Sequence, residues 1–325
     1  MKTASNLEAP VVFIILTNWN NPSDTIECLD SLIKIQYKNT KIVIIDNGSE
    51  DDSMEKFKQW GANNKIDFEV VLDTDLCSPS QKNNFLTIIS LKENIGFGGA
   101  NNVGIQNALK KGADFVLLLN NDTVVTEDFL SSLVKTALNT RKTGITGAKI
   151  KYFDDKDKIW FSGGYIDFLK GAFYHREDDC SGQRESDFIT GCLMLIPSEV
   201  IKKVGCFDER YFLNVEDVDL SCRIKDAGYN LTVDCNAVVF HKVSASIGGL
   251  FSSRNQYYFH RNRMLFFSTR FRGVKKLLFY YFQFFIATPV WIIMQLFKKR
   301  GTAIKGTLVG YFDYLKGRFG RCKYF

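Results

Sequence analysis

The chain has 325 residues, of which 45% are hydrophobic and 14% aromatic, with only 5 prolines. This composition supplies enough apolar material for a packed core and excludes a disordered chain. The net charge of +6 is unevenly distributed, because Arg254 to Phe325 contains 15 lysines and arginines against one acidic residue, Asp313, so that the preceding residues are net acidic. An acidic body with a basic, aromatic tail argues against a nucleic-acid binder and for a globular domain with one end directed at an anionic surface.

The first half of the chain alternates short apolar runs with amphipathic segments, which is typical of a mostly parallel sheet covered on both faces. The pattern predicts strands at Val11–Leu16, Lys41–Ile45, Phe68–Leu72, Leu86–Ser90 and Phe115–Leu119. It predicts helices at Asp24–Ile35, Asp52–Trp60 and Asn101–Lys111, and a further helix capped by Thr126. Turn-forming residues at Asp73–Asn84 indicate a surface insertion before the next strand.

After Gly144 the pattern becomes irregular and predicts an α+β region added to one edge of the sheet. Strands are expected at Ile159–Asp167, Phe188–Ile196 and Leu231–Phe240, and helices at Ser198–Val204 and Asp217–Ala227. We therefore expect an α/β fold in three parts: residues 1–143, residues 144–253, and a helical tail of residues 254–325.

The eight cysteines are scattered along the chain without a CxxC pair, so the sequence predicts neither a zinc site nor a disulfide framework. The first ten residues are polar and lead into an apolar strand rather than into the hydrophobic region of a signal peptide. We therefore expect a reducing, cytoplasmic environment in which the cysteines are buried free thiols.

Polar residues follow the predicted strands where each strand ends. Thr17 and Asn20 follow the first strand, Asp46 the second, Asn94 a later one and Asp122 the last. A lone aspartate at a strand end is more often a turn or cap residue. Four polar ends in one sheet favour a ligand site, because ligands of open parallel sheets bind beyond the carboxyl ends of the strands.

The glycine-rich turn Asn94–Asn102 precedes a predicted helix and includes Gly98. Such a turn lets backbone N–H groups approach an anionic or sugar group closely. It does not match GxGxxG, and the alternative is a helix-start loop that needs glycine for its backbone conformation.

Two residues are candidate ligands of a divalent cation. Asp122 follows a buried apolar run, where a carboxylate can hold a hard cation that bridges two phosphates. His241 ends the run Leu231–Phe240, and a lone histidine there is either structural or a metal ligand.

The densest group of acidic residues is Glu216, Asp217 and Asp219 at a predicted helix start. Acids in a first turn complement the helix dipole, which accounts for one or two of them. Three together repel one another, which raises a pKa, whereas the dipole lowers it, so the sequence leaves the net direction open. A carboxylate tuned toward neutrality suits a general base that takes a proton from a sugar hydroxyl.

These motifs together resemble family-two glycosyltransferases of GT-A fold, in particular the bacterial rhamnosyltransferase-like branch that builds cell-surface polysaccharides. The resemblance covers about Val11 to Arg263, and its most specific parts are ILTNWN, IIDNGSEDDS, ENIGFGGANNVG, LLLNND and GCLMLIPSEVIKKVGCFDERYFLNVEDVDLSCRIKDAGY.

The resemblance implies an inverting, single-displacement transfer of a sugar, with rhamnose as one candidate, from a nucleoside-diphosphate sugar to a glycan or lipid-linked glycan. It implies Asp217 as the catalytic base, with Glu216 and Asp219 in support. The donor would be held by residues of the strand ends and of the glycine-rich turn: Thr17, Asn20, Asp46, Asn94, Gly98 and Asn102. The metal, Mg²⁺ or Mn²⁺, would be held at Asp122 and His241. The family's metal motif is often Asp-x-Asp, whereas Asn120 occupies its first position here.

Two other classes of function remain open. A dinucleotide-dependent oxidoreductase would share the sheet, but the GxGxxG turn is absent after the first strand and hydride transfer has no use for the acidic cluster. A membrane-attached nucleotide-binding scaffold without catalysis would need Asp46 and the tail but not Asp217.

The tail contains the apolar segment Leu277–Phe297, which is flanked by basic residues and interrupted by Pro289. Its 21 residues are just long enough to span a ~30 Å hydrocarbon core, but bases on both sides give no clear orientation. A buried core helix or a homodimer contact would explain the aromatic residues but not the surrounding cations. We therefore expect an interfacial or re-entrant helix pair, broken near Pro289, on the anionic cytoplasmic face of the plasma membrane.

Overall fold

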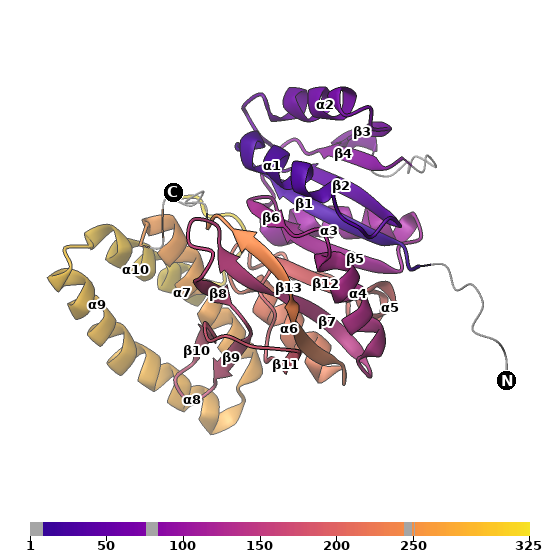
Figure 1. Ribbon diagram of the computed structural model, residues 1–325. Helices are drawn as coiled ribbons and strands as arrows, with labels where there is room; N and C mark the ends of the chain where they lie inside the picture. The colour runs from indigo at the N-terminus through magenta and orange to yellow at the C-terminus, as the bar shows by residue number, and fades with distance from the viewer. Residues whose placement is uncertain (1–8, 76–83, 244–248, 250) are drawn as a thin grey trace.

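The computed structural model describes every residue except 1–8, 76–83, 244–248 and 250 (Figure 1). The described residues form one large sheet, a separate two-stranded hairpin and the surrounding helices. The strands are β1 (Val12–Asn18), β2 (Thr40–Asp46), β3 (Phe68–Leu72), β4 (Leu86–Ser90), β5 (Phe115–Asn120), β6 (Thr123–Val125), β7 (Thr143–Tyr152), β8 (Ile159–Phe161), β9 (Gly164–Asp167), β10 (Ala172–His175), β11 (Gln183–Glu185), β12 (Leu193–Pro197) and β13 (Asn230–His241).

The helices lie between these strands and make up the whole C-terminal region that follows β13. They are α1 (Pro22–Leu32), α2 (Ser53–Asn63), the 3₁₀ turn η1 (Asp73–Asp75), α3 (Gly96–Lys110), α4 (Phe129–Asn139), α5 (Ser198–Val204), α6 (Glu216–Asp226), α7 (Ser253–Arg270), α8 (Gly273–Phe282), the π-helical turn η2 (Gln283–Ala287), α9 (Thr288–Phe297) and α10 (Gly301–Leu315).

The large sheet has the strand order β11-β13-β7-β12-β5-β1-β2-β4-β3, with β6 beside β13 and β8 beside β7. The strands from β3 to β5 are parallel, as expected, because their buried apolar runs alternate with helices. β12 then pairs antiparallel with β5, so the second half of the sheet is mixed. The sheet is continuous across residue 143, and the two predicted halves therefore share one sheet.

Several predicted elements have different bounds in the structure. α3 begins at Gly96 rather than at residue 101, so most of the glycine-rich segment is helix. The strand expected at Ile159–Asp167 is divided into β8 and β9, and only Leu193–Pro197 of the segment that begins at Phe188 is a strand. Thr126 does not cap α4, because its hydroxyl donates to the Val238 carbonyl instead. Of the predicted insertion, Asp73–Asp75 forms η1, and residues 76–83 lie outside the described residues.

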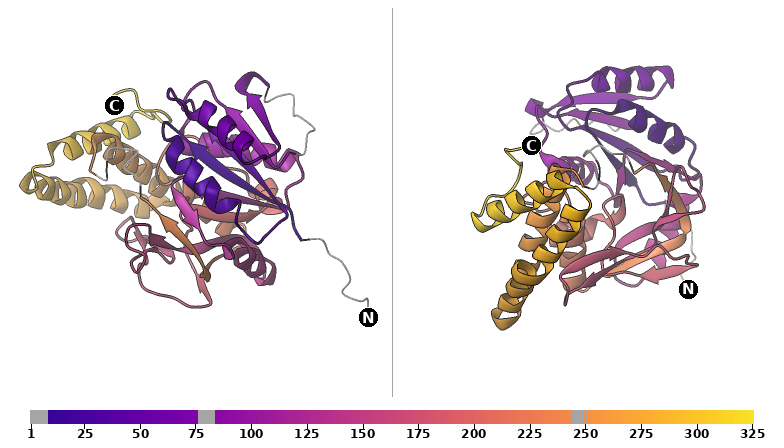
Figure 2. Two further views of the ribbon diagram at one scale, coloured as in Figure 1. Left: turned by 45° about the horizontal axis from the view of Figure 1, so that its top comes forward. Right: turned by 90° about the vertical axis from the view of Figure 1, so that its left-hand side faces the viewer.

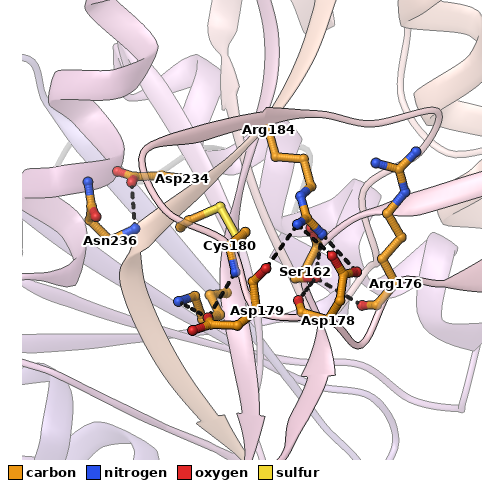
Figure 3. Close-up of a disulfide and its surroundings, with 10 residues drawn as sticks. Ser162, Arg176, Asp178, Asp179, Cys180, Arg184, Asp234 and Asn236 are labelled. Carbon is orange, nitrogen blue, oxygen red and sulfur yellow. Dashed lines mark hydrogen bonds and ion pairs between the residues drawn. A yellow bond between two sulfur atoms is a disulfide. The ribbon is translucent and has the colours of Figure 1, made fainter.

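The expectation of free thiols is wrong for one pair of cysteines. Cys180 and Cys235 form a disulfide that joins the loop between β10 and β11 to β13, with the two Cα atoms 5.6 Å apart (Figure 3). Pairing of β11 with β13 brings together these two residues, which are 55 positions apart in the sequence. Beside the disulfide, Arg184 donates to the two carboxylate oxygens of Asp178 through its two terminal guanidinium nitrogens, at 3.0 and 2.8 Å. The free thiols among the described residues belong to Cys28, Cys192, Cys206, Cys222 and Cys322.

The C-terminal helices gather on the side of the molecule opposite α2 and β3 and project from the body that contains the sheet (Figures 1 and 2). The predicted break near Pro289 is wrong, since α8, η2 and α9 form one continuous helix over Gly273–Phe297. Proline lacks the N–H that a helix interior needs. The π-helical turn before Pro289 widens the helix, so that the Thr288 N–H bonds to the Gln283 carbonyl five residues earlier.

Candidate active site

A cavity of about 210 Å³ opens at the carboxyl ends of β1 and β5, where the sequence predicted a ligand site. Because β1 lies between β2 and β5 in the sheet, the residues after these three strands converge at one edge. The lining comes from the ends of β1, β2 and β5, the starts of α1, α3 and α7, and the loop before α6: Thr17, Trp19, Asn21, Asp24, Asn47, Asn94, Gly96, Phe97, Asn120, Asn121, Asp122, Phe212, Leu213 and Arg254.

Thr17 is the clearest polar group that the protein leaves available at this cavity. It lies opposite Asn120 in the parallel register of β1 and β5. Its hydroxyl oxygen is buried and has no hydrogen-bond partner among the described residues. An unpaired buried hydroxyl is costly, so its position on the cavity wall indicates that a ligand completes its hydrogen bonding.

Asp46 is only 2% exposed and does not line the cavity. Its carboxylate accepts hydrogen bonds from the Asn18 amide at 3.0 Å and from the Ser49 hydroxyl at 2.5 Å. The backbone N–H of Asn20 donates to the same Ser49 hydroxyl at 2.9 Å. Asp46 and Asn20 thus fix the loops after β1 and β2, and their contact with a nucleoside stays a prediction.

Asn94 lines the cavity, whereas Gly98 and Asn102 face another part of the protein. A Cβ atom at Gly98 would approach the Cβ of Phe207 to 3.1 Å, and the Asn102 amide donates to the Phe207 carbonyl at 3.0 Å. These two residues therefore pack α3 against the segment between α5 and α6. Their contact with a donor stays a prediction.

The glycine at the start of α3 is required by the approach of the loop before α6. Gly96 has φ of +86°, and a Cβ atom there would lie 2.5 Å from the Phe212 carbonyl oxygen. The next residue, Phe97, donates its backbone N–H to that same carbonyl at 2.8 Å. The alternative interpretation of the glycine-rich turn, a need for a special backbone conformation, is thus correct at Gly96.

Asp122 and His241 meet at the edge of the cavity. Antiparallel pairing of β6 with β13 places His241 opposite Thr123, and the His241 Nε2 atom lies 3.0 Å from the Asp122 Oδ1 atom. Both side chains are buried, at 5% and 9% exposure. Burial alone would lower the pKa of His241, but the adjacent Cys192 thiol and Asp122 carboxylate outweigh it and raise that pKa to about 10.

These two side chains fit a divalent cation that receives its remaining ligands from elsewhere. A carboxylate oxygen and an imidazole nitrogen are both good ligands for Mn²⁺, and Mg²⁺ is commonly held by one or two carboxylates plus phosphates and water. Within the described residues, no group of three or more His, Cys, Asp or Glu side chains is arranged to hold a metal. A cation at Asp122 and His241 would therefore depend on the phosphates of a bound nucleotide.

The three acids at the start of α6 occupy different environments. Asp217 is half-buried, and its carboxylate accepts the backbone N–H groups of Gly191 and Val218, each at 2.8 Å. Glu216 is 5% exposed, and its Oε2 atom has no hydrogen-bond partner among the described residues. Asp219 binds Arg223 at 2.7 Å one turn further along α6, and Arg223 also donates to the carbonyls of Val204 and Cys206.

The structure decides the pKa direction that the sequence left open. Burial raises the pKa of Asp217 despite the two backbone N–H groups and the nearby His175, which lower it. Burial and the charge of Asp217 raise the pKa of Glu216 to about 8. Desolvation therefore outweighs the helix dipole at this site, and both carboxyl groups bind protons more tightly than in water.

The loop that leads into α6 has an unusual backbone. Three of its residues, Phe212, Asn214 and Val215, have φ between +62° and +76°, which β-branched and bulky residues rarely adopt. The buried residues Arg261 and Asn262 of α7 hold it in place through its carbonyl groups. Arg261 donates to the carbonyls of residues 210, 211 and 320, and Asn262 donates to those of residues 211, 213 and 214.

Arg254, Phe212 and Trp19 are among the cavity-wall residues that the sequence did not identify as site residues. Arg254 lies in the first turn of α7 with its guanidinium 5.3 Å from the centre of the Trp19 ring, and Phe212 closes the cavity beside them. Trp19 lies within a motif that was recognised, so its proximity to strand β1 was an available signal. No local pattern marks Arg254 or Phe212, because their positions depend on the packing of α7 and α6.

Comparison with known proteins identifies the family of this arrangement. Residues 13–205 match the family model for glycosyl transferase family 2, and residues 115–312 match the model for glycosyl transferase family group 2. The first match alone covers more than half of the chain.

Two curated relatives are similar to this sequence. An uncharacterized glycosyltransferase of Rickettsia prowazekii (strain Madrid E) is 27% identical over 215 residues, which are 63% of this chain and 55% of the relative. The poly-beta-1,6-N-acetyl-D-glucosamine synthase of Staphylococcus aureus (strain MSSA476) is 26% identical over 239 residues, which are 72% of this chain and 50% of the relative. The chain therefore spans about half the length of these curated relatives.

Two solved structures show the same fold. GalNAc-T7 with UDP, GalNAc and Mn²⁺ has a TM-score of 0.63 and 17% identity, covering 85% of this chain and 50% of that chain. The mannosyltransferase PcManGT from Pyrobaculum calidifontis, in complex with GDP-Man and Mn²⁺, has a TM-score of 0.57 and 15% identity. The match covers 95% of this chain and 76% of that chain. The predicted fold class is confirmed: a mixed α/β fold with a large central sheet that matches GT-A neighbours.

Proposed function

Because this chain belongs to glycosyl transferase family 2, we propose that it moves a sugar from a nucleoside-diphosphate sugar to a glycan or lipid-linked glycan acceptor by an inverting single displacement. We further propose that the reaction serves bacterial cell-surface polysaccharide synthesis. Rhamnose is the candidate sugar from the sequence resemblance, and the names of the relatives add N-acetylglucosamine and mannose as alternatives.

The observation that carries this proposal is the cavity between the strand ends and the loop before α6. It offers the unpaired hydroxyl of Thr17, the cation of Arg254 and the aromatic ring of Trp19, and it ends at the Asp122 carboxylate. An aromatic ring, a positive charge and a metal-binding carboxylate along one cavity suit the base, the diphosphate and the bridging cation of a nucleotide sugar. Both solved neighbours hold a nucleotide or nucleotide sugar together with Mn²⁺.

We assign the proton transfer to Asp217. Asp217 lies near the cavity wall, since a Cβ atom at Gly191 would lie 3.2 Å from the ring of the lining residue Phe97 and 3.4 Å from the Asp217 Cβ atom. Burial raises the pKa of Asp217, which makes its carboxylate a stronger base for an acceptor hydroxyl than an exposed aspartate. The two backbone N–H groups fix the orientation of the carboxylate, and the hydroxyl oxygen would then attack the anomeric carbon from the face opposite the leaving nucleotide.

A divalent cation, Mg²⁺ or Mn²⁺, held by Asp122 and His241 would supply stabilisation of the negative charge that develops on the leaving diphosphate. The chain's own contribution on that side is to orient the donor. Thr17 and Asn94 both line the cavity with polar side chains, and Arg254 adds a positive charge beside Trp19.

The test is a turnover assay with a panel of UDP-, dTDP- and GDP-sugars, Mn²⁺ and water-soluble p-nitrophenyl glycosides as acceptors. Asp217→Asn should lower kcat by ~10²–10⁴-fold and leave nucleotide binding, measured by thermal stabilisation, within a few fold. Asp219→Asn is the matched control in the same helix, with a smaller expected effect because Asp219 binds Arg223.

The competing candidate is a membrane-attached nucleotide-binding scaffold. It predicts nucleotide binding without turnover in the wild-type protein, and unchanged behaviour in Asp217→Asn. Turnover of any donor in the panel by the wild type excludes the scaffold.

We also propose that the tail binds the anionic cytoplasmic face of the plasma membrane, where a lipid-linked acceptor would be presented. Gly273–Phe297 is the one helix among the described residues that is long and apolar enough to cross a membrane, with mean hydropathy 1.7 over an 18-residue stretch. Its apolar side chains point outward: Leu277, Phe285 and Phe297 are 67%, 71% and 85% exposed. Lys275, Lys276, Lys298, Lys299 and Arg300 flank this surface.

The polar residues of the same helix face the protein rather than a lipid. Gln283 and Thr288 are 1% and 7% exposed and both bond to the Tyr311 hydroxyl of α10, at 2.7 and 2.9 Å. A helix with a buried polar edge and an exposed apolar face is suited to lie in the membrane interface. A homodimer that buries this face is the alternative, and liposome sedimentation separates the two.

A further inference from the structure

A line of rings connects the two ends of the proposed reaction centre. The Trp160 ring lies 4.6 Å from the His241 ring and 4.8 Å from the His175 ring, measured between ring centres. His241 contacts Asp122, so Trp160 stands next to the proposed metal site. At the other end, the His175 ring lies 6.0 Å from the Phe188 ring, and three residues after Phe188 the backbone N–H of Gly191 donates to the Asp217 carboxylate at 2.8 Å.

The local fold explains how these rings come together. Trp160 belongs to β8, which pairs with β7 of the large sheet. His175 is the last residue of β10 in the separate hairpin. The backbone bonds between Ser162 and Arg176 and between Arg176 and Gly163, at 2.8 and 2.7 Å, join the end of β8 to the end of β10. This connection sets the His175 ring against Trp160, Phe161 and Phe188.

These rings are not ordinary core residues. Trp160 is half-buried and His175 is exposed, although Phe161 and Phe188 beneath them are fully buried. The rings packed around the imidazole desolvate it and so lower the pKa of His175, whereas the nearby charge of Asp217 raises that pKa and the charge of His241 lowers it. His175 therefore lies between the proposed base and the proposed metal site, in a place that solvent can reach.

The chemistry of the proposed reaction defines what must occupy this place. The acceptor hydroxyl has to reach Asp217 and, at the same time, the anomeric carbon of a donor whose diphosphate lies at Asp122. The sugar that carries this hydroxyl must then rest on the surface between the two residues. Carbohydrate and other small-ligand sites combine aromatic side chains with a few placed polar groups.

We propose that Trp160 and His175 form the binding platform for the acceptor sugar, with Trp160 packing against the sugar ring and His175 hydrogen bonding to one of its hydroxyl groups. The platform rests on the proposed function, since it names where the acceptor of that reaction binds. It also gives the two half-buried tryptophans of the site different roles: Trp19 contacts the donor and Trp160 contacts the acceptor.

The experiment measures steady-state kinetics with the donor that turns over in the panel and p-nitrophenyl glycosides as acceptors. Trp160→Ala and His175→Ala should each raise the acceptor KM by ~10-fold and leave nucleotide-induced thermal stabilisation unchanged. Trp160→Phe should restore most of the acceptor affinity, which separates loss of the platform from misfolding. Trp19→Ala should give the reverse pattern, with a raised donor KM and an unchanged acceptor KM.

Tyr165→Ala is the matched control. Tyr165 lies on β9 of the same hairpin, is 39% exposed and stacks on Tyr174. By the alternation of side chains along β10, this pair lies on the face of the hairpin opposite His175. Loss of this aromatic residue should change neither KM.

The outcomes distinguish the platform from the function on which it rests. If the wild type turns over a donor but Trp160→Ala leaves the acceptor KM unchanged, or raises the donor KM equally, the platform is wrong and the proposed function stands. If the wild type turns over no donor of the panel, the proposed function is wrong and the platform fails with it. A raised acceptor KM in Trp160→Ala and His175→Ala, with Tyr165→Ala unaffected, establishes the platform.

Discussion

The donor side and the base side of this site are held in place by different means. On the donor side, the sheet itself sets the geometry: Thr17 and Asn120 are neighbours because β1 and β5 are in parallel register. On the base side, Asp217 follows a loop with three left-handed residues, and side chains from α7 fix that loop. A site can thus combine one half that regular structure determines with another half that depends on contacts between distant segments.

The largest effect should come from the metal on the donor side. We expect EDTA to abolish turnover and Mn²⁺ or Mg²⁺ to restore it, because Asp122 and His241 alone cannot neutralise a leaving diphosphate. Asp122→Ala should weaken metal-dependent nucleotide binding more than Asp46→Ala does, since Asp46 is already bonded to Asn18 and Ser49. Full turnover after dialysis against EDTA would show that the donor side works without a cation.

The base side should be sensitive to a residue that touches neither substrate. Asn262→Ala removes the side-chain amide that donates to the carbonyls of Tyr211, Leu213 and Asn214, at 2.7 to 2.8 Å. The loop would relax from its left-handed conformation and displace Asp217, so we expect kcat to fall by ~10–100-fold.

The control for this prediction is Thr269→Ala, which removes a local hydrogen bond to the Phe266 carbonyl in the same helix. Nucleotide-induced stabilisation should persist in both variants, and kcat should change only in Asn262→Ala. Equal losses of kcat in the two variants would indicate a general weakening of α7 rather than positioning of the base.

The same division explains what the sequence could predict. Strand β4 and helix α5 have the predicted bounds, and the polar strand ends converge as expected, because periodicity and strand order are local or follow from the topology. Gly98 and Asn102 were expected at the ligand but contact Phe207, since a glycine-rich pattern does not say what approaches it. The Cys180–Cys235 disulfide and the positions of Arg254 and Trp160 at the cavity and beside His241 arise only when distant segments pack.

The basic tail is tested by its binding to membranes. Replacing Lys275 and Lys276 with alanine should lower binding to anionic phosphatidylserine liposomes by roughly 30-fold, at ~1 kcal/mol for each lysine near the surface. Lys56→Ala with Lys58→Ala on α2, at the other end of the molecule in Figure 1, is the charge-matched control and should have no effect. Binding should weaken as salt is raised. Wild-type protein that stays in the supernatant at low salt would favour the dimer contact.

The smallest effect concerns stability on the base side, at Glu216. Burial and Asp217 raise the pKa of Glu216 from 4.5 to about 8 in the folded protein, so between these pH values the unfolded chain releases a proton that the folded protein retains. The contribution of Glu216 to stability is therefore fully present below about pH 4.5 and is lost as pH rises toward 8. Glu216→Gln removes this dependence of stability on pH. The amide group of the glutamine would also lack a hydrogen-bond partner at the buried Oε2 position, but that loss of stability does not vary with pH.

The measurement is thus the difference in melting temperature between Glu216→Gln and the wild type, followed from pH 4 to pH 8. We expect the difference to shift by a few degrees in favour of the variant as pH rises. In an Asp217→Asn background the shift should shrink, because the charge that helps to raise the pKa of Glu216 is gone. A difference that stays constant with pH in both backgrounds would mean that Glu216 is ionised in the folded protein, and that the repulsion between the two acids does not help to tune Asp217 as a base.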